Sequence, residues 1–442
     1  PATLYRPMHT AFIILSLLGF ACSLNLYHPP SRPFPLAVAS LFAGVLVGEL
    51  TLFVMALQIA GTGLFIWAGA VTGWWAAWAM LLNIVSWLML YNYTLESLQS
   101  ADTLREQVRA LSGTPRAQPR PSSLPLLLRP LSTIRNTLSG TQWQRCLRPF
   151  HIRLNSVRCL RDIPFATVGT GSTALHLDLY TPRRTVHNAP VLLYLHGGGL
   201  LENAGSKQGQ GLPLLNEMAD RGWIAASSNY RLSPTHRWPA HLQDCKTALL
   251  WIKEHIRDYG GNPDFVVVAG DSAGGQLAAL MALTANQQQY QPAQPDTDTA
   301  VQGAICGYGV LDFGNLHSCQ HDGKITGEWV RRVLPAECNR GGDDEQALLA
   351  SANAVAQIHE QAPPFLLVHG DCDSLIAPAE SELFARRLQA VSQQPVVHGS
   401  IGGAQHGFNM LRSPRGELVL EEVAHFAEWL HQRSDSHATG TA

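Results

Sequence analysis

The chain has 442 residues, of which 46% are hydrophobic and 14% charged, and its formal net charge at pH 7 is −2. The near-neutral total hides a basic stretch at 105–161, with 11 arginines against one acid, and an acidic part from 166 onward, with 18 basic and 28 acidic side chains. This distribution excludes a uniformly basic nucleic-acid-binding protein, and the low charge content indicates that part of the chain lies in apolar surroundings.

The first hundred residues predict transmembrane helices. An apolar run without charge covers 11–26, and the stretch 36–91 holds a single acidic or basic side chain, Glu49. Tryptophans and tyrosines crowd the ends of these runs, as is typical of the headgroup region. A helix needs about 20 residues to cross a bilayer. The three expected spans are 10–27, 36–58 and 72–92.

Processing of the N-terminus is an alternative for the first span. Residues 8–26 could form a cleaved signal sequence, and 19–22 resemble a lipoprotein cleavage box. A buried core is the alternative for the apolar block as a whole, and it is disfavoured because the sequence is continuously apolar, has clustered tryptophans and shows no amphipathic period. Glu49 would cost about 2.5–3.5 kcal/mol facing lipid at the bilayer centre. We therefore expect it to face a neighbouring helix, a cavity or the interface.

Residues 94–158 are expected to link the membrane region, 1–93, to the rest of the chain. The part at 94–111 predicts an amphipathic helix, and 112–131 is rich in proline, serine and arginine. This basic stretch lacks aromatic platforms, so it favours contact with anionic headgroups over nucleic acid. Under the positive-inside rule its arginines predict an inner- or plasma-membrane protein whose C-terminal part faces the cytoplasm. The cysteines are scattered and do not predict a disulfide framework. Reduced thiols are consistent with a cytoplasmic location of the C-terminal part.

Strands and helices alternate over 159–434, which predicts an α/β fold with a mostly parallel sheet and helices on both faces. The stretches 165–168 and 175–180 are expected to open the sheet as an antiparallel pair. The last residues, 435–442, are expected to form a flexible tail.

Three glycines follow His196 at the end of the apolar strand 191–195. Their uncovered N–H groups suit an oxyanion, which requires donors already in place, and we assign Gly197 and Gly198 to this role. The alternatives are a flexible glycine loop or a phosphate-binding loop, and a phosphate-binding loop would end in Lys-Ser or Lys-Thr, which is absent here. We expect His196 to shape this loop rather than to act as a base.

The run Gly270-Asp271-Ser272-Ala273-Gly274-Gly275 lies between a β-branched strand and a good helix former. This order predicts a nucleophile elbow, a strained turn that exposes the Ser272 hydroxyl at the carboxyl edge of a sheet. The N–H of Ala273 would be a third oxyanion donor. An ordinary tight turn is the alternative.

Two further stretches are expected to shape the site. Arg231 and Asp244 predict an internal ion pair that pins a loop beside the glycines, with substrate contact as the alternative. About 55 residues separate the apolar strands 301–308 and 365–370, more than a simple crossover needs. We expect a cap over the site near 312–361.

The order Ser, Asp, His along the chain locates the remaining partners. Asp373 follows the strand 365–370 and is our candidate acid, with Asp371 in reserve. His406, on a loop near two glycines, is our candidate base. The competing histidines, both inside predicted strands, are His369 and His398.

These motifs together resemble the hormone-sensitive-lipase-like esterases of the α/β-hydrolase superfamily, over roughly residues 160–432. The matching segments are 196–199, 229–234, 238–240, 270–275, 373–375 and 406–408. The resemblance implies an α/β-hydrolase fold with the triad Ser272, Asp373 and His406. The chemistry of such a triad requires no cofactor, and the sequence shows no metal-ligand spacing. Two departures concern Ala377, where a second carboxylate is frequent, and the cap helices usually found ahead of the first strand, whose place a membrane region takes.

We therefore expect a membrane-anchored serine esterase or lipase that hydrolyses lipophilic carboxylic esters of short to medium acyl length through an acyl-enzyme. An acyltransferase using the same triad is one alternative, and a non-catalytic ligand-binding protein on a hydrolase scaffold is another. A third is a membrane part that mediates assembly with a transporter or biosynthetic complex. The expected partners of the whole protein are the ester substrate and the lipid bilayer, with no nucleic acid. Its oligomeric state is left open.

Overall fold

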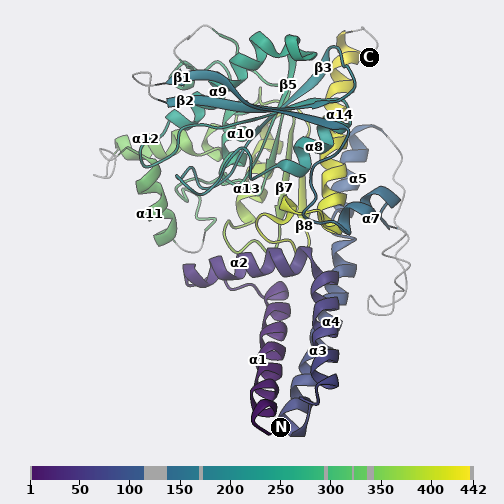
Figure 1. The fold of residues 1–442 in the computed structure, drawn as a ribbon. Helices are drawn as coiled ribbons and strands as arrows, with labels where there is room; N and C mark the ends of the chain where they lie inside the picture. The colour runs from purple at the N-terminus through teal and green to yellow at the C-terminus, as the bar shows by residue number, and fades with distance from the viewer. Residues whose placement is uncertain are drawn as a thin grey trace.

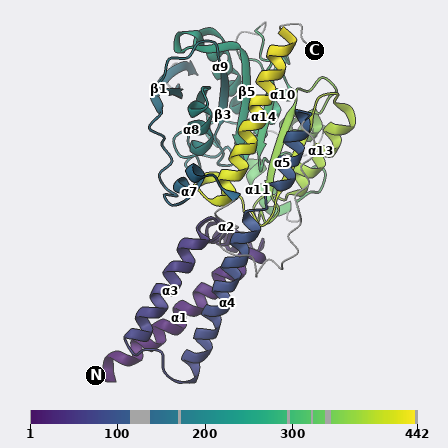
Figure 2. The same cartoon turned by 90° about the vertical axis from the view of Figure 1, so that its right-hand side faces the viewer.

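A stalk of helices carries an α/β domain in the computed structural model (Figures 1 and 2). The structure describes residues 2–113, 137–168, 173–292, 297–320, 323–335 and 343–438. Most of the basic stretch expected at 112–131 lies outside these residues, as do 321–322 and 336–342 of the expected cap and the last four residues of the expected tail.

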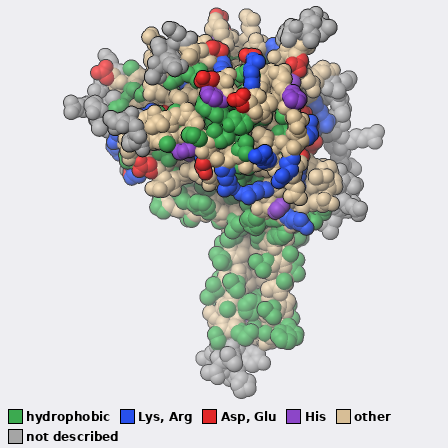
Figure 3. All heavy atoms as spheres, turned by 45° about the horizontal axis from the view of Figure 1, so that its top comes forward, with side chains coloured by type: hydrophobic (Ala, Val, Ile, Leu, Met, Phe, Trp, Pro, Cys, Tyr) green, Lys and Arg blue, Asp and Glu red, His purple; other side chains and the backbone are tan. Residues whose placement is uncertain are grey.

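The stalk consists of α1 (Ala2–Tyr27), α2 (Phe34–Glu49), α3 (Thr51–Trp67) and α4 (Gly73–Ser97). In the part of the chain that the structure describes, two helices are long and apolar enough to cross a membrane, and α2 with α3 would make a third if the bent pair is one span. Apolar side chains cover the outside of the stalk (Figure 3). Helix α2 lies across its top, beneath the α/β domain (Figure 1).

The continuous helix expected over 36–58 is wrong. The chain bends by 87° between α2 and α3, at Leu50, whose φ of −115° and ψ of 27° are not helical. Glu49, directly before the bend, is buried against Arg415 of the α/β domain. This partner lies 366 positions away in the sequence, so the local sequence pattern could not predict this contact beside the bend.

The α/β domain is built on an eight-stranded sheet of order β1-β2-β4-β3-β5-β6-β7-β8. Strands β1 and β2 pair antiparallel, as do β2 and β4, and the remaining neighbours are parallel. This confirms the predicted mostly parallel sheet and its antiparallel opening. The strands are β1 (Val157–Val168), β2 (Thr173–Pro182), β3 (Ala189–Leu195), β4 (Ile224–Ser228), β5 (Gly261–Asp271), β6 (Gly303–Gly307), β7 (Phe365–Gly370) and β8 (Val396–Ile401).

Helices cover both faces of the sheet (Figure 2). Strand β3 shows why, because alternate side chains of a strand point to opposite faces: Val191 and Leu193 belong to one apolar cluster, Leu192 and Tyr194 to the other. On the first face lie α9 (Ala240–His255), α10 (Ala273–Leu283) and α13 (Ala379–Val391). On the second lie α5 (Asp102–Leu111), α8 (Leu212–Asp220) and α14 (Pro414–Ala438), with α7 (Gly140–Cys146) beside α14.

Candidate active site

Ser272 stands on a sharp turn between β5 and α10, with φ of 57° and ψ of −124°. A non-glycine residue pays a conformational cost in this region of φ, which persists only where the surroundings enforce it. They do so here through close backbone approach: a Cβ on Gly270 would lie 2.2 Å from the Gly274 carbonyl oxygen, and one on Gly274 would lie 2.0 Å from that of Leu195. The elbow predicted from the sequence therefore forms, with the hydroxyl at the carboxyl edge of the sheet.

The structure brings the three predicted triad side chains together. The Ser272 hydroxyl lies 2.9 Å from His406 Nε2, where it can donate a hydrogen bond. His406 Nδ1 lies 2.7 Å from Asp373 Oδ2 and can donate to it. His406 is largely buried, and its ring packs against that of Tyr308 in a T-shaped contact with centroids 4.6 Å apart.

The Asp373 side chain is fully buried and accepts hydrogen bonds at both oxygens. Its Oδ1 accepts the N–H groups of Leu375 and Ile376, each at 2.8 Å. Its Oδ2 also accepts a bond from His369 Nε2 at 3.1 Å. Burial by itself would raise the pKa of Asp373, but the His406 and His369 rings and their hydrogen bonds hold that pKa well below its ordinary value. The carboxylate is thus kept ionised beside the imidazole.

The competing residues occupy other places. His369 lies beside the acid rather than the serine, with Nδ1 at 2.7 Å from the Ser381 hydroxyl. His398 lies in β8, and its backbone pairs with Gln107 of α5. Asp371 accepts the Gly403 N–H at 2.6 Å, so it holds the turn that leads to His406. Sequence reasoning missed the contact of His369 with Asp373, whose only signal was a polar residue in an apolar strand.

Of the predicted oxyanion donors, Gly197 lies beside Ser272, and its N–H already has a partner. A Cβ on Gly197 would lie 3.0 Å from Ser272 Cβ, but its N–H donates to Gln210 Oε1 at 2.5 Å. Gly198 has a φ of 111°, and a Cβ there would lie 2.7 Å from the backbone of Ala204, so this position has no space for a side chain. Ala273 opens α10, where N–H groups lack an intrahelical partner. A substrate oxygen would have to displace Gln210 to reach the Gly197 N–H.

Tyr230 packs against the loop that carries Gly197, Gly198 and Gly199. The His196 ring stacks on Tyr230 with centroids 4.4 Å apart, and the Tyr230 hydroxyl donates to the His196 carbonyl at 2.6 Å. Burial lowers the pKa of His196 to about 4, so it is neutral at pH 7 and suits a structural role. The predicted ion pair is confirmed: Arg231 binds Asp244 through two nitrogens at 2.7 and 2.8 Å.

Helices α11 (Gly323–Val333) and α12 (Asp343–Ala352) occupy the stretch where a cap was expected. Trp329 of α11 reaches the site, because its Nε1–H donates to the Gly199 carbonyl at 2.5 Å. Its ring packs edge-on against Phe313 with centroids 4.9 Å apart. One large aromatic side chain from this region therefore touches the oxyanion loop.

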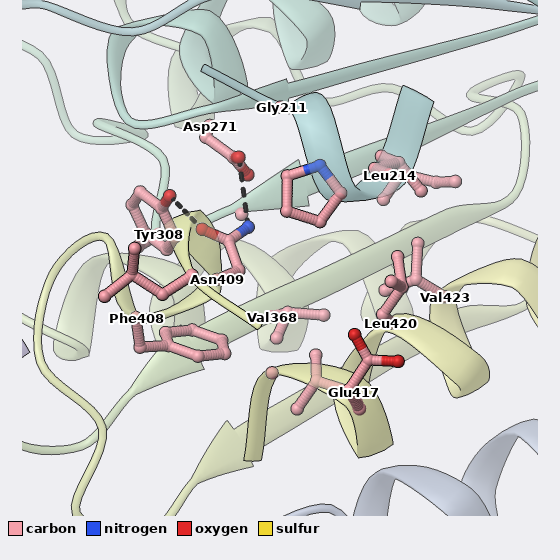
Figure 4. A pocket seen from close by; sticks show the side chains of 16 residues that line it. Gly211, Leu214, Asp271, Tyr308, Val368, Phe408, Asn409, Glu417, Leu420 and Val423 are labelled. Carbon is pink, nitrogen blue, oxygen red and sulfur yellow. Dashed lines mark hydrogen bonds between the residues drawn. The ribbon is translucent and has the colours of Figure 1, made fainter. Parts of the chain in front are cut away.

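Behind the nucleophile lies a small cavity of about 40 Å³, on the α8 and α14 side of the sheet (Figure 4). Asp271 borders it and accepts hydrogen bonds from Tyr194 at 2.8 Å and Asn409 at 3.0 Å. Burial raises the pKa of Asp271. The cavity has room for only a few water molecules, so it is no acyl pocket. Among the residues that the structure describes, no group of three or more histidine, cysteine or acidic side chains could hold a metal ion.

Comparisons with known proteins show which family the chain resembles. Residues 177–388 match the family described as BD-FAE. The probable carboxylic ester hydrolase LipM of Mycobacterium tuberculosis is 34% identical over 427 residues, which cover 94% of this chain and 92% of LipM. Esterase LipQ of the same organism is 36% identical over 278 residues, 62% of each chain. A solved bacterial heroin esterase matches with a TM-score of 0.52 at 22% identity, over 74% of this chain and 97% of its own. This likeness confirms the predicted α/β-hydrolase fold class.

Proposed function

Because the chain belongs to the carboxylic ester hydrolases of the α/β-hydrolase superfamily that include LipM, we propose that it is a membrane-anchored serine esterase with Ser272, His406 and Asp373 as its triad. One observation carries the assignment: Ser272 Oγ, His406 and Asp373 form a continuous hydrogen-bonded chain with contacts of 2.9 and 2.7 Å. A nucleophile, a base and a group that orients the base, in that order, are what acyl transfer to a serine requires.

The reaction has two halves. Ser272 Oγ attacks the carbonyl carbon of the ester while its proton passes to His406 Nε2, and that proton then leaves with the alcohol. The acyl group remains on Ser272. Water attacks the acyl-enzyme and gives its proton to His406, and the carboxylic acid departs as the proton returns to Ser272. Asp373 keeps the proton on His406 Nδ1 throughout, so that Nε2 is free to accept.

The tetrahedral oxyanion would be held by backbone N–H groups. Ala273 and Gly198 supply two donors, and Gly197 supplies a third when Gln210 moves aside. Loss of one such donor in hydrolases costs roughly 2.7–4 kcal/mol of barrier. The contact between Gly197 and Gln210 therefore suggests that substrate binding reorganises this loop.

Lipophilic esters of short to medium acyl length are the substrates we favour. The loops that follow β7 and β8 contact the stalk. After β7, the Ser374 hydroxyl donates to the Ala37 carbonyl of α2 at 3.4 Å. After β8, the Gly403 carbonyl accepts the Tyr93 hydroxyl of α4. Large apolar side chains on α2 are exposed, which suits a helix at the membrane surface. They are Phe34, Leu36, Phe42 and Leu46, between 42 and 69% exposed. Esters dissolved in the bilayer would thus concentrate beside the site.

The membrane would be the inner or plasma membrane, with the hydrolase domain on its cytoplasmic side, as the arginine distribution favours. Protease treatment of sealed vesicles tests this orientation. Right-side-out vesicles should protect the hydrolase domain and inverted vesicles should expose it. Digestion from the outer side would reverse the proposal.

A fluorophosphonate probe tests the nucleophile. The wild type and Ser206→Ala, which changes an exposed serine, should be labelled, whereas Ser272→Ala should not. Labelling of Ser272→Ala would refute the assignment. A series of p-nitrophenyl esters then ranks the acyl length, and equal rates from C2 to C16 would contradict a shaped pocket. Product analysis with added alcohol distinguishes hydrolysis from acyl transfer.

A further inference from the structure

A buried polar cluster joins the stalk to the hydrolase domain. Arg415 Nη1 lies 2.6 Å from Glu49 Oε1, and the Ser413 hydroxyl donates to Glu49 Oε2 at 2.6 Å. The Arg415 guanidinium also covers the Tyr93 ring at 4.8 Å and donates to its hydroxyl at 3.1 Å. All four side chains are at most 4% exposed. They meet where α2 and α4 contact α14, at the boundary between the stalk and the α/β domain, whose ribbons Figure 2 shows.

The cluster reaches the loop that carries the proposed base. The Tyr93 hydroxyl donates to the Gly403 carbonyl, three residues before His406. Gly403 has a φ of 68°, and a Cβ there would lie 3.2 Å from both the Tyr93 ring and Arg415 Nη2. The turn is therefore packed against the stalk without space for a side chain. On its other side, Asp371 holds the Gly403 N–H.

A second contact from the stalk reaches the same loop. A Cβ on Gly44 of α2 would lie 3.2 Å from Gln405 Cγ. The Gln405 side-chain oxygen accepts the N–H of Ser374 at 2.7 Å and that of His406 at 3.0 Å. Gln405 thus ties the acid loop to the base loop while it rests on α2.

A buried ion pair is not needed merely to attach the hydrolase domain to the stalk, since apolar packing anchors a domain at lower desolvation cost. Directional bonds between charged groups instead fix how two bodies sit against each other. The bonds here end on the backbone of the His406 loop. A shift of about 1 Å in such a side chain can cost a hundredfold in rate.

We infer that Tyr93, fixed by Glu49 and Arg415, is a positioning residue for His406, and that the apolar helices form part of the active-site scaffold as well as the anchor. The inference rests on the proposed triad. It also predicts that membrane helices and hydrolase domain act as one catalytic unit, even on substrates dissolved in water.

Two variants of the full-length chain, purified in detergent, test the inference. Tyr93→Phe removes the hydroxyl. Gly48→Ala keeps the Tyr93 hydroxyl but sets a Cβ 2.9 Å from it, so the hydroxyl must shift. Two matched changes in the stalk serve as controls. Tyr27→Phe removes a hydroxyl that donates to the Met89 carbonyl within the stalk, and Gly63→Ala adds a Cβ with no atom within 4 Å.

The readouts are kcat and KM for p-nitrophenyl acetate, the rate of fluorophosphonate labelling and the thermal unfolding midpoint. Tyr93→Phe and Gly48→Ala should lower kcat and the labelling rate about tenfold or more with KM nearly unchanged, while the controls stay within twofold. Variants whose midpoints match their controls give the decisive comparison. Equal kcat in Tyr93→Phe and Tyr27→Phe would overturn the inference, as would a loss explained by a lowered midpoint in both test variants. Failure of wild-type Ser272 to react would instead refute the proposed triad.

Discussion

Replacing Asp373 by asparagine should abolish most activity through the tautomer of His406. Asp373 Oδ1 accepts two backbone N–H groups, each at 2.8 Å, and Oδ2 faces His406 Nδ1 at 2.7 Å. An asparagine would keep its only oxygen toward the two backbone donors, because its NH₂ group cannot accept from them. The NH₂ group would then face His406 Nδ1. That nitrogen would have to become an acceptor, and the ring proton would move to Nε2, where it blocks transfer from Ser272.

The corresponding change in a serine protease lowers kcat about 10⁴-fold, which is about 5 kcal/mol of barrier. We expect the same magnitude here, because the hydrogen bonds that would orient the amide are equally well defined. The assay is kcat for a short p-nitrophenyl ester together with the fluorophosphonate labelling rate. Asp371→Asn is the matched control, since Asp371 accepts the Gly403 N–H and an asparagine oxygen can do so too. Its kcat should stay within a few-fold of the wild type. The reasoning fails if Asp373→Asn keeps a tenth of wild-type kcat, or if both variants lose activity equally.

Further changes test other contacts of the site. His369→Leu removes a donor to Asp373 Oδ2, which makes the carboxylate more basic. The acid limb of the pH profile of kcat/KM should therefore move to higher pH by as much as about one unit. An unmoved limb would contradict this. Trp329→Phe removes the bond to the Gly199 carbonyl and should lower kcat/KM about fivefold, roughly 1 kcal/mol; an unchanged value would show that this contact is dispensable. Burial raises the pKa of Glu380 to about 7. Its protonated form therefore contributes stability that is fully present below about pH 4.5 and lost as the pH rises through 7, up to about 3 kcal/mol. Glu380→Gln should flatten the thermal unfolding midpoint over that range, and parallel profiles would refute the assignment.

The sequence predicted those parts of the site that local chemistry determines. The elbow at Ser272 needs small neighbours and a strand before it, and both are visible in the letters of the chain. The order of Asp373 and His406 follows from topology, since both stand after strands of one parallel sheet. The ion pair of Arg231 with Asp244 spans 13 positions on one loop and helix, and it was predicted as well.

Contacts between distant segments could not be predicted in this way. Glu49, directly before the bend at Leu50, pairs with Arg415 from a distant segment, whereas a hydropathy pattern treats 36–58 as one span. Gln210 covers the Gly197 N–H from a loop that carries no motif. His369 faces Asp373 because of the way the chain turns after β7, a property of side-chain direction and not of residue type.

The orientation of the site relative to the stalk follows from one short connection. Helix α4 passes into α5 within a few residues, and α5 runs along β8 in the opposite direction. Gln107 bonds to the His398 backbone at 2.9 Å, and a Cβ on Gly399 would meet Leu104 at 3.0 Å. Further toward the stalk, Tyr93 meets Gly403. Residue numbers thus rise along β8 as they fall along α5 and α4, so the carboxyl end of β8 must lie at the stalk.

Parallel pairing extends this direction to the neighbouring strands, because β5, β6, β7 and β8 share one orientation. Ser272 after β5 and Asp373 after β7 therefore face the stalk together with His406. A domain on a long tether could turn its site in any direction. Here the strand direction and the continuous passage from α4 to α5 hold the nucleophile on the side of the apolar helices. Under the proposed membrane anchoring, an ester that leaves the bilayer would therefore approach Ser272 from that side.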